Sequence, residues 1–452
     1  MDYLNNFGDD WISYIETKIK GIVLNIFLKK KILIYGLGKS GLSTFRFLKN
    51  KSDIFLYDDF QLKINSLDVK EKLINFKNIS KINFDQIILS PGIDINKCKL
   101  SKYLKKNYNK VYSDLDVFYS FFKNDCITIT GTNGKSTTCQ LLYEVLLDQK
   151  FDVRLVGNIG NPILSLKNVK KETIFIIEAS SYQLEYSKIF KSKYVAIINI
   201  SPDHIERHKT LNNYVKAKFR LLKNQRKGNL AFVKKEDSLI NKQLKLSKFD
   251  SKIIKVNTKE NNFLKNIDNN YFLTEANREN LLFVLEISKY LNIKSNLLIK
   301  TVQKFNGLKY RQQTILKRKN LKIINDSKST SFSSSISLLK SNKNIYWLLG
   351  GVPKKGDKFN LPKRYFKNIK AFVYGENKKF FNKKLKGKID FTNFGSLKDA
   401  LSRILKIIKK EKFKDKTILF SPCAASFDSF KNFEERGLYF NKLIKKNSNG
   451  IE

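Results

Sequence analysis

Cysteine, histidine and acidic side chains are all scarce in this chain. Its 452 residues include four cysteines and two histidines, and 41 acidic side chains stand against 87 lysines and arginines. The cysteines, at positions 98, 126, 139 and 423, form no Cys-x-x-Cys pair. This spacing argues against a disulfide framework or a zinc site and predicts a protein of the reducing cytoplasm.

Long apolar runs are also missing, and none approaches the length that crosses a bilayer. The chain opens with Asp2, Asp9 and Asp10 rather than with a basic segment, so we expect neither a signal peptide nor integral membrane association.

The formal net charge of +46 is compatible with nucleic acid or anionic lipid as a partner. The lysines are spread along the whole chain, however, which favours a compositional bias, and we expect no nucleic-acid partner.

Residues 11–28 form an unusual N-terminal segment. Trp11, Ile15, Ile19 and Ile22 fall at helical spacing, with lysines elsewhere on the turn. This pattern predicts an amphipathic extension within residues 1–30. Such a helix would lie either on a membrane or partner, or on its own domain, and the second alternative is favoured.

The most informative segment is Cys126–Thr138, which reads CITITGTNGKSTT. An apolar, β-branched run stops at Gly131, a glycine-containing turn carries Lys135 and Ser136, and helical spacing follows. This order predicts a strand, a phosphate-binding loop and a helix whose first N–H groups face an anion. Because Ile129 stands where the full P-loop pattern has its first glycine, the match is a shortened Gly-x-x-Gly-Lys-Ser. The loop predicts ATP binding.

An earlier segment has the layout of a dinucleotide-binding βαβ unit. A short apolar run enters a Gly-x-Gly-x-x-Gly turn at Gly36, Gly38 and Gly41, and the next predicted strand ends at Asp58. This fingerprint alone does not say which nucleotide is bound. The Ser-Pro-Gly turn at residues 90–92 follows a further strand and would line the same crevice.

Acidic residues and both histidines follow two predicted strands in the middle of the chain. Glu178 directly follows the apolar run at residues 173–177. The strand predicted over residues 194–200 is followed by a loop that holds His204 and His208. Histidines beside acids at a strand end predict a metal or proton-transfer site. Magnesium prefers oxygen ligands, so Ser136, Glu178 and a substrate phosphate are natural partners for it, with one imidazole possible.

Polar clusters sit at strand ends in the last third of the chain as well, after apolar runs that end at residues 325, 349 and 420. Three α/β units in series, with clefts between them, are the predicted architecture. We expect the following segments: an N-terminal extension (1–30), then domains over 31–122, 123–308 and 309–452.

Several motifs occur in one order: Gly131-Thr-Asn-Gly-Lys-Ser-Thr137, Glu178-Ala-Ser-Ser, Asp203-His-x-x-Arg-His208, Asn325-Asp-Ser-Lys328 and Ser421-Pro-x-x-Ala-Ser426. Together they closely resemble the Mur ligases, the ATP-dependent amino-acid-adding enzymes of peptidoglycan synthesis. The resemblance runs from about residue 31 to about residue 440. Asn325-Asp-Ser-Lys328 and the ending Phe430-Lys-Asn-Phe-Glu-Glu-Arg-Gly437 favour the member of the family that adds D-glutamate.

The resemblance implies a Rossmann-like, UDP-binding N-terminal domain, a central P-loop ATPase-type α/β domain and a Rossmann-like C-terminal domain. It also implies that ATP and Mg²⁺ serve a reaction in which UDP-N-acetylmuramoyl-L-alanine becomes an acyl phosphate that D-glutamate then attacks.

The same resemblance assigns residues to roles. Catalytic residues would be Lys135, His204 and Lys218, and magnesium ligands would be Ser136, Glu178, His204 and Lys218, the last as a carbamate. ATP would contact Gly131, Thr132, Asn133, Gly134, Lys135, Ser136, Thr137, Asn277, Asn280, Arg311 and Asp326. The other substrates would contact Gly38, Lys39, Ser40, Gly41, Asp58, Ser90, Gly92, Asn158, Lys328, Thr330, Lys354, Ser426 and Phe433.

One departure from the family pattern concerns the end that holds adenine, where Ala276 replaces a histidine that usually precedes Asn277.

Three other functions stay open on the sequence. The first is a different Mur-type ligase or a folate polyglutamate synthetase, although the Gly36–Gly41 unit argues against the folate enzymes. The second is a basic ATP-binding protein that docks on nucleic acid. The third is an NAD-dependent oxidoreductase, against which the ATP loop counts.

Overall fold

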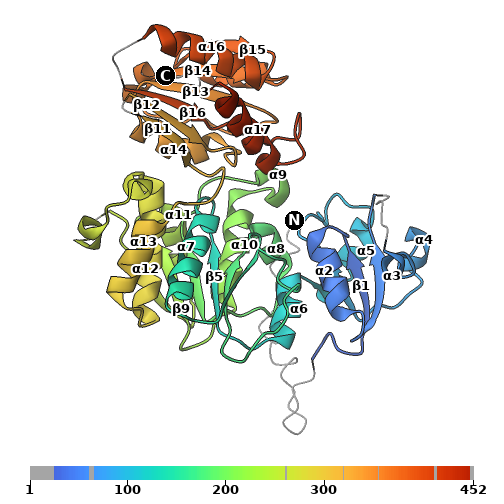
Figure 1. The fold of residues 1–452 in the computed structure, drawn as a ribbon. Helices are drawn as coiled ribbons and strands as arrows, with labels where there is room; N and C mark the ends of the chain where they lie inside the picture. Colours follow the sequence, from blue (N-terminus) through green and yellow to red (C-terminus); the bar gives the residue numbers. More distant parts are fainter. Residues whose placement is uncertain are drawn as a thin grey trace.

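The computed structural model describes residues 25–60, 66–259, 262–318, 320–354, 356–411 and 415–447. Three sheets follow one another along the chain, each flanked by helices, which gives the predicted α/β architecture with three successive domains (Figure 1). The strands of the three sheets fall within residues 31–122, 123–308 and 309–452, and we keep these limits as proposed domain boundaries. Among the described residues, no helix combines the length and apolar character that a membrane span requires.

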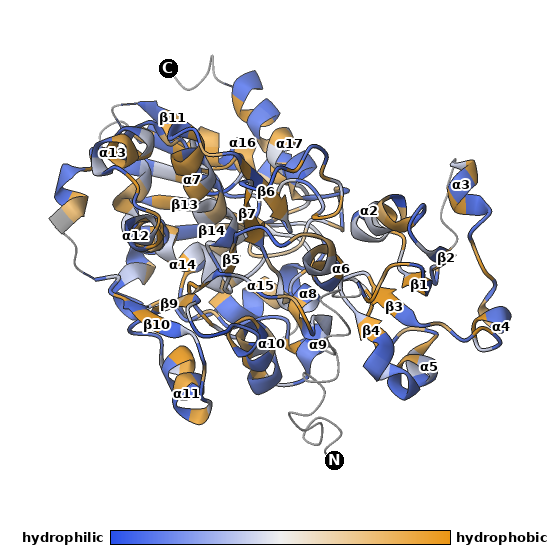
Figure 2. Ribbon diagram, turned by 90° about the horizontal axis from the view of Figure 1, so that it is seen from below, coloured by the Kyte–Doolittle hydropathy of each residue, from blue (hydrophilic) through white to orange (hydrophobic). Residues whose placement is uncertain are grey.

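The N-terminal domain has a parallel sheet with the strand order β2-β1-β3-β4. Its strands are β1 (Lys31–Tyr35), β2 (Asp53–Tyr57), β3 (Gln86–Leu89) and β4 (Val111–Tyr112). Its helices are α2 (Lys39–Leu48), α3 (Leu67–Lys70), α4 (Phe76–Ile79), α5 (Ser101–Lys106), η1 (Tyr108–Lys110) and α6 (Asp114–Phe121). The strands are apolar while α3 and α5 carry polar residues (Figure 2), as expected for a buried parallel sheet.

The predicted amphipathic helix falls mostly on residues 1–24, which lie outside the described residues. Its last residues form a turn over 26–29. Phe27 in this turn is buried, and its ring meets that of Tyr112 edge-on at 5.3 Å. This end of the segment therefore packs on the N-terminal domain.

The middle domain has a parallel sheet with the order β10-β9-β8-β5-β7-β6. Its strands are β5 (Cys126–Thr130), β6 (Val153–Gly157), β7 (Ile174–Glu178), β8 (Tyr194–Ile197), β9 (Leu230–Lys234) and β10 (Lys252–Val256). Its helices are α7 (Lys135–Asp148), α8 (Ser181–Tyr186), α9 (Ile205–His208), α10 (Leu211–Lys223), α11 (Ser238–Leu246), η2 (Asn262–Asn266), η3 (Asn270–Leu273), α12 (Glu275–Tyr290) and α13 (Ser295–Lys304).

The order of the middle strands fixes where a ligand can enter. The chain leaves β5 towards β6 on one side and leaves β8 towards β9 on the other. Such a switch opens a crevice at the carboxyl ends of the two neighbouring strands, where ligands bind in open α/β sheets. The strand predicted over residues 194–200 ends at Ile197 in the structure, because the following residues turn towards the loop after β5.

The N-terminal and middle domains share one hydrophobic core. A single cluster contains Phe118 of α6 and Phe175 of β7, whose rings meet edge-on at 4.9 Å. Beside them, the buried carboxylate of Asp116 accepts hydrogen bonds at Oδ1 from the N–H groups of residues 188, 189 and 190 at 2.8–3.0 Å and from Ser187 Oγ at 3.1 Å. Its Oδ2 accepts from the N–H and hydroxyl of Ser113. Asp116 thus joins the start of α6 to a turn of the middle domain.

The C-terminal domain has the strand order β11-β12-β16-β13-β14-β15, in which β11 is antiparallel to β12 and the other pairs are parallel. Its strands are β11 (Gln313–Arg318), β12 (Leu321–Asn325), β13 (Ile345–Gly350), β14 (Ile369–Tyr374), β15 (Asp390–Phe394) and β16 (Lys416–Phe420). Its helices are α14 (Phe332–Ser341), η4 (Lys363–Asn368), α15 (Lys378–Leu385), α16 (Leu397–Lys410) and α17 (Phe433–Lys446).

Candidate active site

The phosphate-binding loop predicted from the sequence lies between the carboxyl end of β5 and the start of α7 (Figure 1). Gly134 is the N-cap of α7 with a φ of 84°, a conformation that favours glycine. A Cβ at Gly134 would lie 2.1 Å from Oδ1 of Asn280 on α12, so glycine also permits this close approach. Asn280 is therefore beside the loop. Asn277 instead donates from Nδ2 to the carbonyl of Tyr271 at 2.9 Å and holds the start of α12.

Two lysines converge on the carbonyl of Gly131. Lys135 Nζ donates to this oxygen at 3.0 Å and to the carbonyl of Thr132 at 2.9 Å, and Lys218 Nζ, from α10, donates to Gly131 O at 2.8 Å. Burial lowers the pKa of Lys135 below its ordinary value and that of Lys218 well below it. The carboxylates of Glu178 and Asp203 act in the opposite direction on both amines, which places all four side chains in one electrostatic neighbourhood.

Glu178 is the last residue of β7, and one oxygen of its carboxylate accepts a hydrogen bond while the other has no hydrogen-bond partner among the described residues. Its side chain is 1% exposed, and Oε1 accepts a hydrogen bond from Asn158 Nδ2 at 2.6 Å. Oε2 is buried without a hydrogen-bond partner among the described residues. A buried carboxylate oxygen without a partner is costly and suits a cation, so the residues fit magnesium at this point. Within the described ranges, no three His, Cys, Asp or Glu side chains form a metal cluster by themselves, so hydroxyl and phosphate oxygens would have to complete the set.

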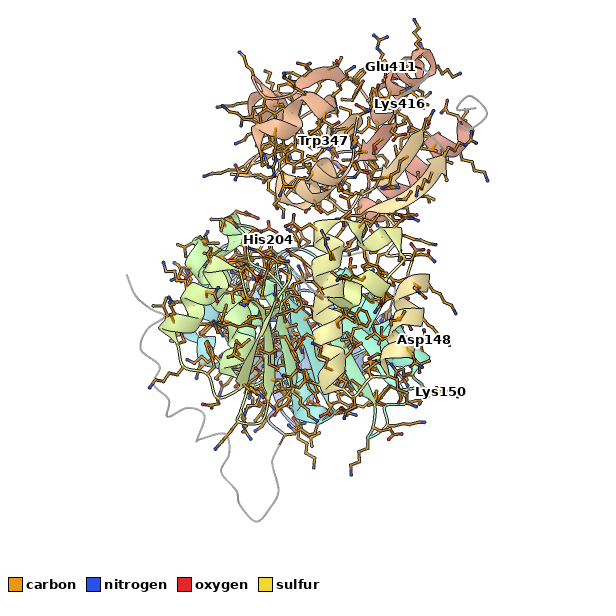
Figure 3. All side chains as sticks on the ribbon, turned by 90° about the vertical axis from the view of Figure 1, so that its left-hand side faces the viewer. Asp148, Lys150, His204, Trp347, Glu411 and Lys416 are labelled. Atoms are coloured by element: carbon orange, nitrogen blue, oxygen red, sulfur yellow. The ribbon has the colours of Figure 1, made fainter. Side chains whose placement is uncertain are left out.

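His204 lies on the edge of the middle domain that faces the C-terminal domain (Figure 3). Its Nδ1 is 2.7 Å from the hydroxyl of Tyr182, and its Nε2 is 3.4 Å from Oδ2 of Asp203. Burial lowers the pKa of His204 to about 4, so the imidazole is neutral at pH 7, the form that can bind a metal. His208 is different, because it is buried with its Nε2 3.0 Å from Ser181 Oγ. The two histidines that the sequence groups together thus have different hydrogen-bond partners, although both rings pack against Tyr182 and Tyr214.

The C-terminal domain brings cations to the same edge. Lys354 Nζ is 2.5 Å from Oδ1 of Asp203, which links the two domains through the neighbour of His204. Lys328 Nζ lies 4.1 Å from the centre of the Phe433 ring, and the Arg311 guanidinium lies 5.7 Å from the same ring. Burial, reinforced by Arg311, lowers the pKa of Lys328 to about 8. The arrangement is suited to an anionic substrate.

Arg436, a buried side chain of α17 that the sequence did not single out, anchors two loops of the C-terminal domain. Its Nη2 donates to the carbonyls of Ser327 at 2.7 Å and Ala424 at 2.9 Å. These carbonyls belong to the loop after β12, which bears Lys328 and Thr330, and to the loop after β16, which bears Ser426. The structure therefore brings these predicted residues to adjacent strand ends.

Asp326 is buried between the same two loops. Its carboxylate accepts hydrogen bonds from Ser421 Oγ at 2.8 Å and from the N–H of Gln312 at 3.0 Å. Burial raises its pKa to about 7, although both hydrogen bonds oppose this shift. The carboxyl group is thus held near the point of half-protonation at neutral pH.

This shift predicts a pH-dependent loss of stability that Asp326→Asn removes. In the unfolded chain Asp titrates near pH 4, so a folded-state pKa of about 7 means that the folded protein binds the proton more tightly. The group's contribution to stability is complete below about pH 4 and is lost as the pH rises towards 7. Thermal unfolding of both proteins from pH 4 to pH 8 should show a smaller decline in Tm for the variant. Parallel curves would contradict the prediction.

The predicted sugar-nucleotide residues surround the glycine-rich turn between β1 and α2. Asp58 Oδ2 accepts from the N–H of Leu37 at 2.7 Å, and Ser90 Oγ donates to the carbonyl of Gly36 at 2.5 Å. A Cβ at Gly41 would lie 1.9 Å from the same carbonyl, so only glycine allows α2 to pass so close to the turn. Gly38 is the N-cap of α2, with Lys39 and Ser40 in its first turn, and Gly92 lies exposed on the neighbouring loop.

Arg207, to which the sequence assigned no role, connects the loop at residues 90–93 to the His204 loop. Its Nη2 donates to the carbonyl of Ile93 at 2.6 Å and to the hydroxyl of Tyr186 at 2.8 Å, while Nε donates to Glu185 at 2.9 Å. The N–H of Ile93 in turn donates to the carbonyl of Ser90. The arginine of the Asp-His-x-x-Arg-His motif was the available signal, but its partner across the domain boundary is visible only in the fold.

Replacing Arg207 by methionine should weaken use of the sugar nucleotide that the sequence predicts for the N-terminal domain. The loss of hydrogen bonds from a charged group to Ile93 and Tyr186 frees the loop at residues 90–93, so we expect KM for the sugar nucleotide to rise about tenfold. KM for ATP should change much less. Steady-state kinetics with each substrate varied in turn checks this, and an equal rise of both KM values would show general damage instead.

Comparison with known proteins identifies the family. The model described as "Mur ligase middle domain" matches residues 129–303, and "Mur ligase MurD-like, N-terminal domain" matches residues 30–111. The chain is 35% identical to the UDP-N-acetylmuramoylalanine–D-glutamate ligase of Rickettsia felis over 95% of this chain and 100% of that protein. It is 33% identical to the protein of the same name from Rickettsia prowazekii, over 94% and 99% of the two chains.

Solved structures share the fold at low sequence identity. UDP-N-acetylmuramate-alanine ligase MurC from Thermotoga maritima superposes with a TM-score of 0.52 at 16% identity, covering 92% of this chain and 100% of that one. The MurF ligase of Thermotoga maritima in complex with ADP gives a TM-score of 0.55 at 13% identity, covering 94% and 96%. With the family matches and the near full-length relatives, these observations lead to one conclusion: the chain belongs to the Mur ligase family.

Proposed function

We propose that this chain joins D-glutamate to UDP-N-acetylmuramoyl-L-alanine in the cytoplasm, with ATP as the energy source, as a step of peptidoglycan synthesis. The observation that carries the proposal is the 35% identity to a ligase named for this reaction, over 95% of this chain and 100% of that ligase. The geometry agrees with it, because a phosphate-binding loop, a carboxylate with a free oxygen and a group of cations meet at one edge of the middle sheet.

The chemistry needs activation of a carboxylate. An oxygen of the alanyl carboxylate attacks the γ-phosphorus of ATP, the bond from that phosphorus to the β,γ-bridging oxygen breaks, and ADP leaves. The D-glutamate amine then attacks the acyl phosphate carbonyl, loses a proton and expels inorganic phosphate. Two anions approach one another in the first step, so Lys135 and the N–H groups at the start of α7 would stabilise the charge on the transferred phosphoryl group.

We propose that Ser136, Glu178, His204 and carbamylated Lys218 hold Mg²⁺ in this site. The free Oε2 of Glu178 and the neutral imidazole of His204 fit this role, and a carbamate would turn the amine of Lys218 into an oxygen ligand. When bound, magnesium supplies neutralisation of the phosphate charge. Two neighbouring side chains would orient these ligands: Asn158 donates to Glu178 Oε1, and the Tyr182 hydroxyl lies 2.7 Å from Nδ1 of His204.

We propose that the two remaining substrates occupy the neighbouring domains. The sugar nucleotide would lie against the glycine-rich turn, in contact with Gly38, Lys39, Ser40, Gly41, Asp58, Ser90, Gly92 and Asn158. D-Glutamate would be bound by its two carboxylates in the cationic region formed by Lys328, Thr330, Lys354, Ser426 and Phe433. Nucleotide contacts outside the loop would come from Asn277, Asn280, Arg311 and Asp326.

Phosphate release from ATP tests the proposal. The purified chain is supplied with ATP, Mg²⁺, UDP-N-acetylmuramoyl-L-alanine and one amino acid or dipeptide at a time, including L-alanine, L- and D-glutamate, meso-diaminopimelate and D-alanyl-D-alanine. Steady release with D-glutamate alone, together with the mass of the ligated product, is the expected result. Release with a different amino acid would replace the substrate, and no release with any of them would overturn the assignment.

A further inference from the structure

The residues of the phosphate-binding loop divide into two groups by the use of their backbone N–H groups. α7 begins at Lys135 with Gly134 as N-cap, and the N–H of Thr138 donates to the carbonyl of Gly134 at 3.0 Å as the first bond of the helix ladder. The first four N–H groups of a helix have no partner within it, and here they belong to residues 134–137. These four groups are available to an anion.

The N–H groups of Thr132 and Asn133 are already in use. Both donate to Oδ1 of Asn199, at 3.1 and 2.9 Å, and the Thr132 N–H also lies 3.0 Å from the carbonyl of Asn199. Asn199 Nδ2 returns a hydrogen bond to the carbonyl of Asn133 at 3.0 Å. One side-chain amide therefore satisfies both the donors and an acceptor of the turn between Gly131 and Gly134.

The rest of this turn is held from the same side. The hydroxyl of Thr132 lies 3.0 Å from that of Tyr214 and 3.1 Å from the carbonyl of Ser201, and it accepts from the N–H of Ser201 at 2.9 Å. Asn199 comes two residues after β8 ends, at the switch between β5 and β8. An amide is the side chain that can accept two N–H groups with its oxygen and donate with its nitrogen.

We propose that Asn199 is a positioning residue that keeps the N–H groups of Thr132 and Asn133 away from the nucleotide, so that the phosphates of ATP are received by the N–H groups of residues 134–137 alone. This inference rests on the proposed use of ATP. It assigns a role to a residue that touches neither the phosphates nor the metal. It also explains how a shortened loop, without the first glycine of the full P-loop, presents a defined set of donors.

Hydrogen exchange resolved to single amides tests the division in the wild-type protein. Addition of ATP and Mg²⁺ should slow exchange at residues 134–137, whereas residues 132 and 133 should be slow before and after addition. Slow exchange that appears at residue 133 only with ATP would overturn the proposal while leaving ATP use intact. No change at any of these amides, together with no phosphate release, would remove both the proposal and the proposed function.

Asn199→Ala provides the second test, with Asn199→Ser in reserve should the alanine variant fail to fold. Without the side-chain amide Asn133 loses the partners of both its N–H and its carbonyl, while the Thr132 N–H keeps the backbone carbonyl of Asn199. Exchange should therefore become faster chiefly at residue 133, and KM for ATP should rise about tenfold. The KM values for the sugar nucleotide and D-glutamate should stay within about twofold of wild type, since only the nucleotide loop is altered.

Asn124→Ala is the matched control. Asn124 precedes β5 at the opposite end of the same sheet and is also half-buried, and its Nδ2 donates to the carbonyls of residues 170, 171 and 173 at 2.8–3.1 Å. Its loss should lower Tm by an amount similar to that for Asn199→Ala, with KM for ATP unchanged. The proposal fails if both variants raise KM for ATP alike. It also fails if Asn199→Ala lowers Tm but leaves KM for ATP unchanged, because Asn199 would then have only a structural role.

Discussion

Lys135→Ala should lower the turnover of ATP-dependent ligation by at least about a hundredfold, with the fold retained. Loss of a single well-placed charge-stabilising donor typically costs about 2.7–4 kcal/mol of transition-state stabilisation, which corresponds to that factor. Lys135 is the cation at the start of α7, and its Nζ now donates to the carbonyls of Gly131 and Thr132, so it is already held within the loop. The measurement is kcat for phosphate release with all substrates saturating.

The control for this prediction is Lys150→Ala. Lys150 is exposed at the far end of the same domain from His204 (Figure 3), so its removal takes away one positive charge without touching the loop. Its kcat should equal that of the wild type. A Lys135→Ala protein with wild-type Tm and full turnover would contradict the role given to the loop.

Asp116→Ala should be the most destabilising of the single substitutions considered, lowering the free energy of unfolding by about 3 kcal/mol or more. The buried carboxylate satisfies three backbone N–H groups of the turn at residues 188–190 together with Ser113 and Ser187, and each donor left buried without a partner costs about 1–3 kcal/mol. Denaturant unfolding followed by fluorescence or circular dichroism measures this difference.

Asp125→Ala is the comparison for Asp116. Asp125 pairs with Lys193 at 2.6 Å, but both side chains are about half exposed, at 48% and 45%. Solvent screens such pairs, so this change should leave the unfolding midpoint almost unaltered. Equal destabilisation by the two substitutions would show that the hydrogen bonds of Asp116 contribute little.

The parts of the fold that could be predicted are those coded by local pattern. The runs before Gly131 and Gly36 are apolar, short and followed by glycine, and both became strands that enter helices through turns. Edge strand β11 was not anticipated, because Gln313–Arg318 is half-exposed and alternates too weakly to differ from a loop. Its antiparallel pairing with β12 comes from tertiary contact rather than from its own composition.

The candidate site was predictable where a motif carries the chemistry and not where a side chain acts across the fold. Lys135 and Glu178 could be predicted as site residues, because each is a charged residue at the point where a predicted strand or its loop ends. Asn199 looked like a strand residue, since nothing in its neighbours reports that its amide reaches a loop 66 residues earlier. Arg207 and Arg436 are similar cases: their partners lie 114 and 109 residues away, and only the fold brings them together.

The core shared by the first two sheets bears on how freely the parts of this enzyme can be exchanged. Phe118 packs on Phe175, and Asp116 holds the turn after α8, so the boundary near residue 122 cuts through a common interior rather than a linker. A chimera that imports the first domain of a relative would therefore have to import the facing surface of the second with it. Of the three domains, only the one built on the third sheet could be exchanged as a separate unit.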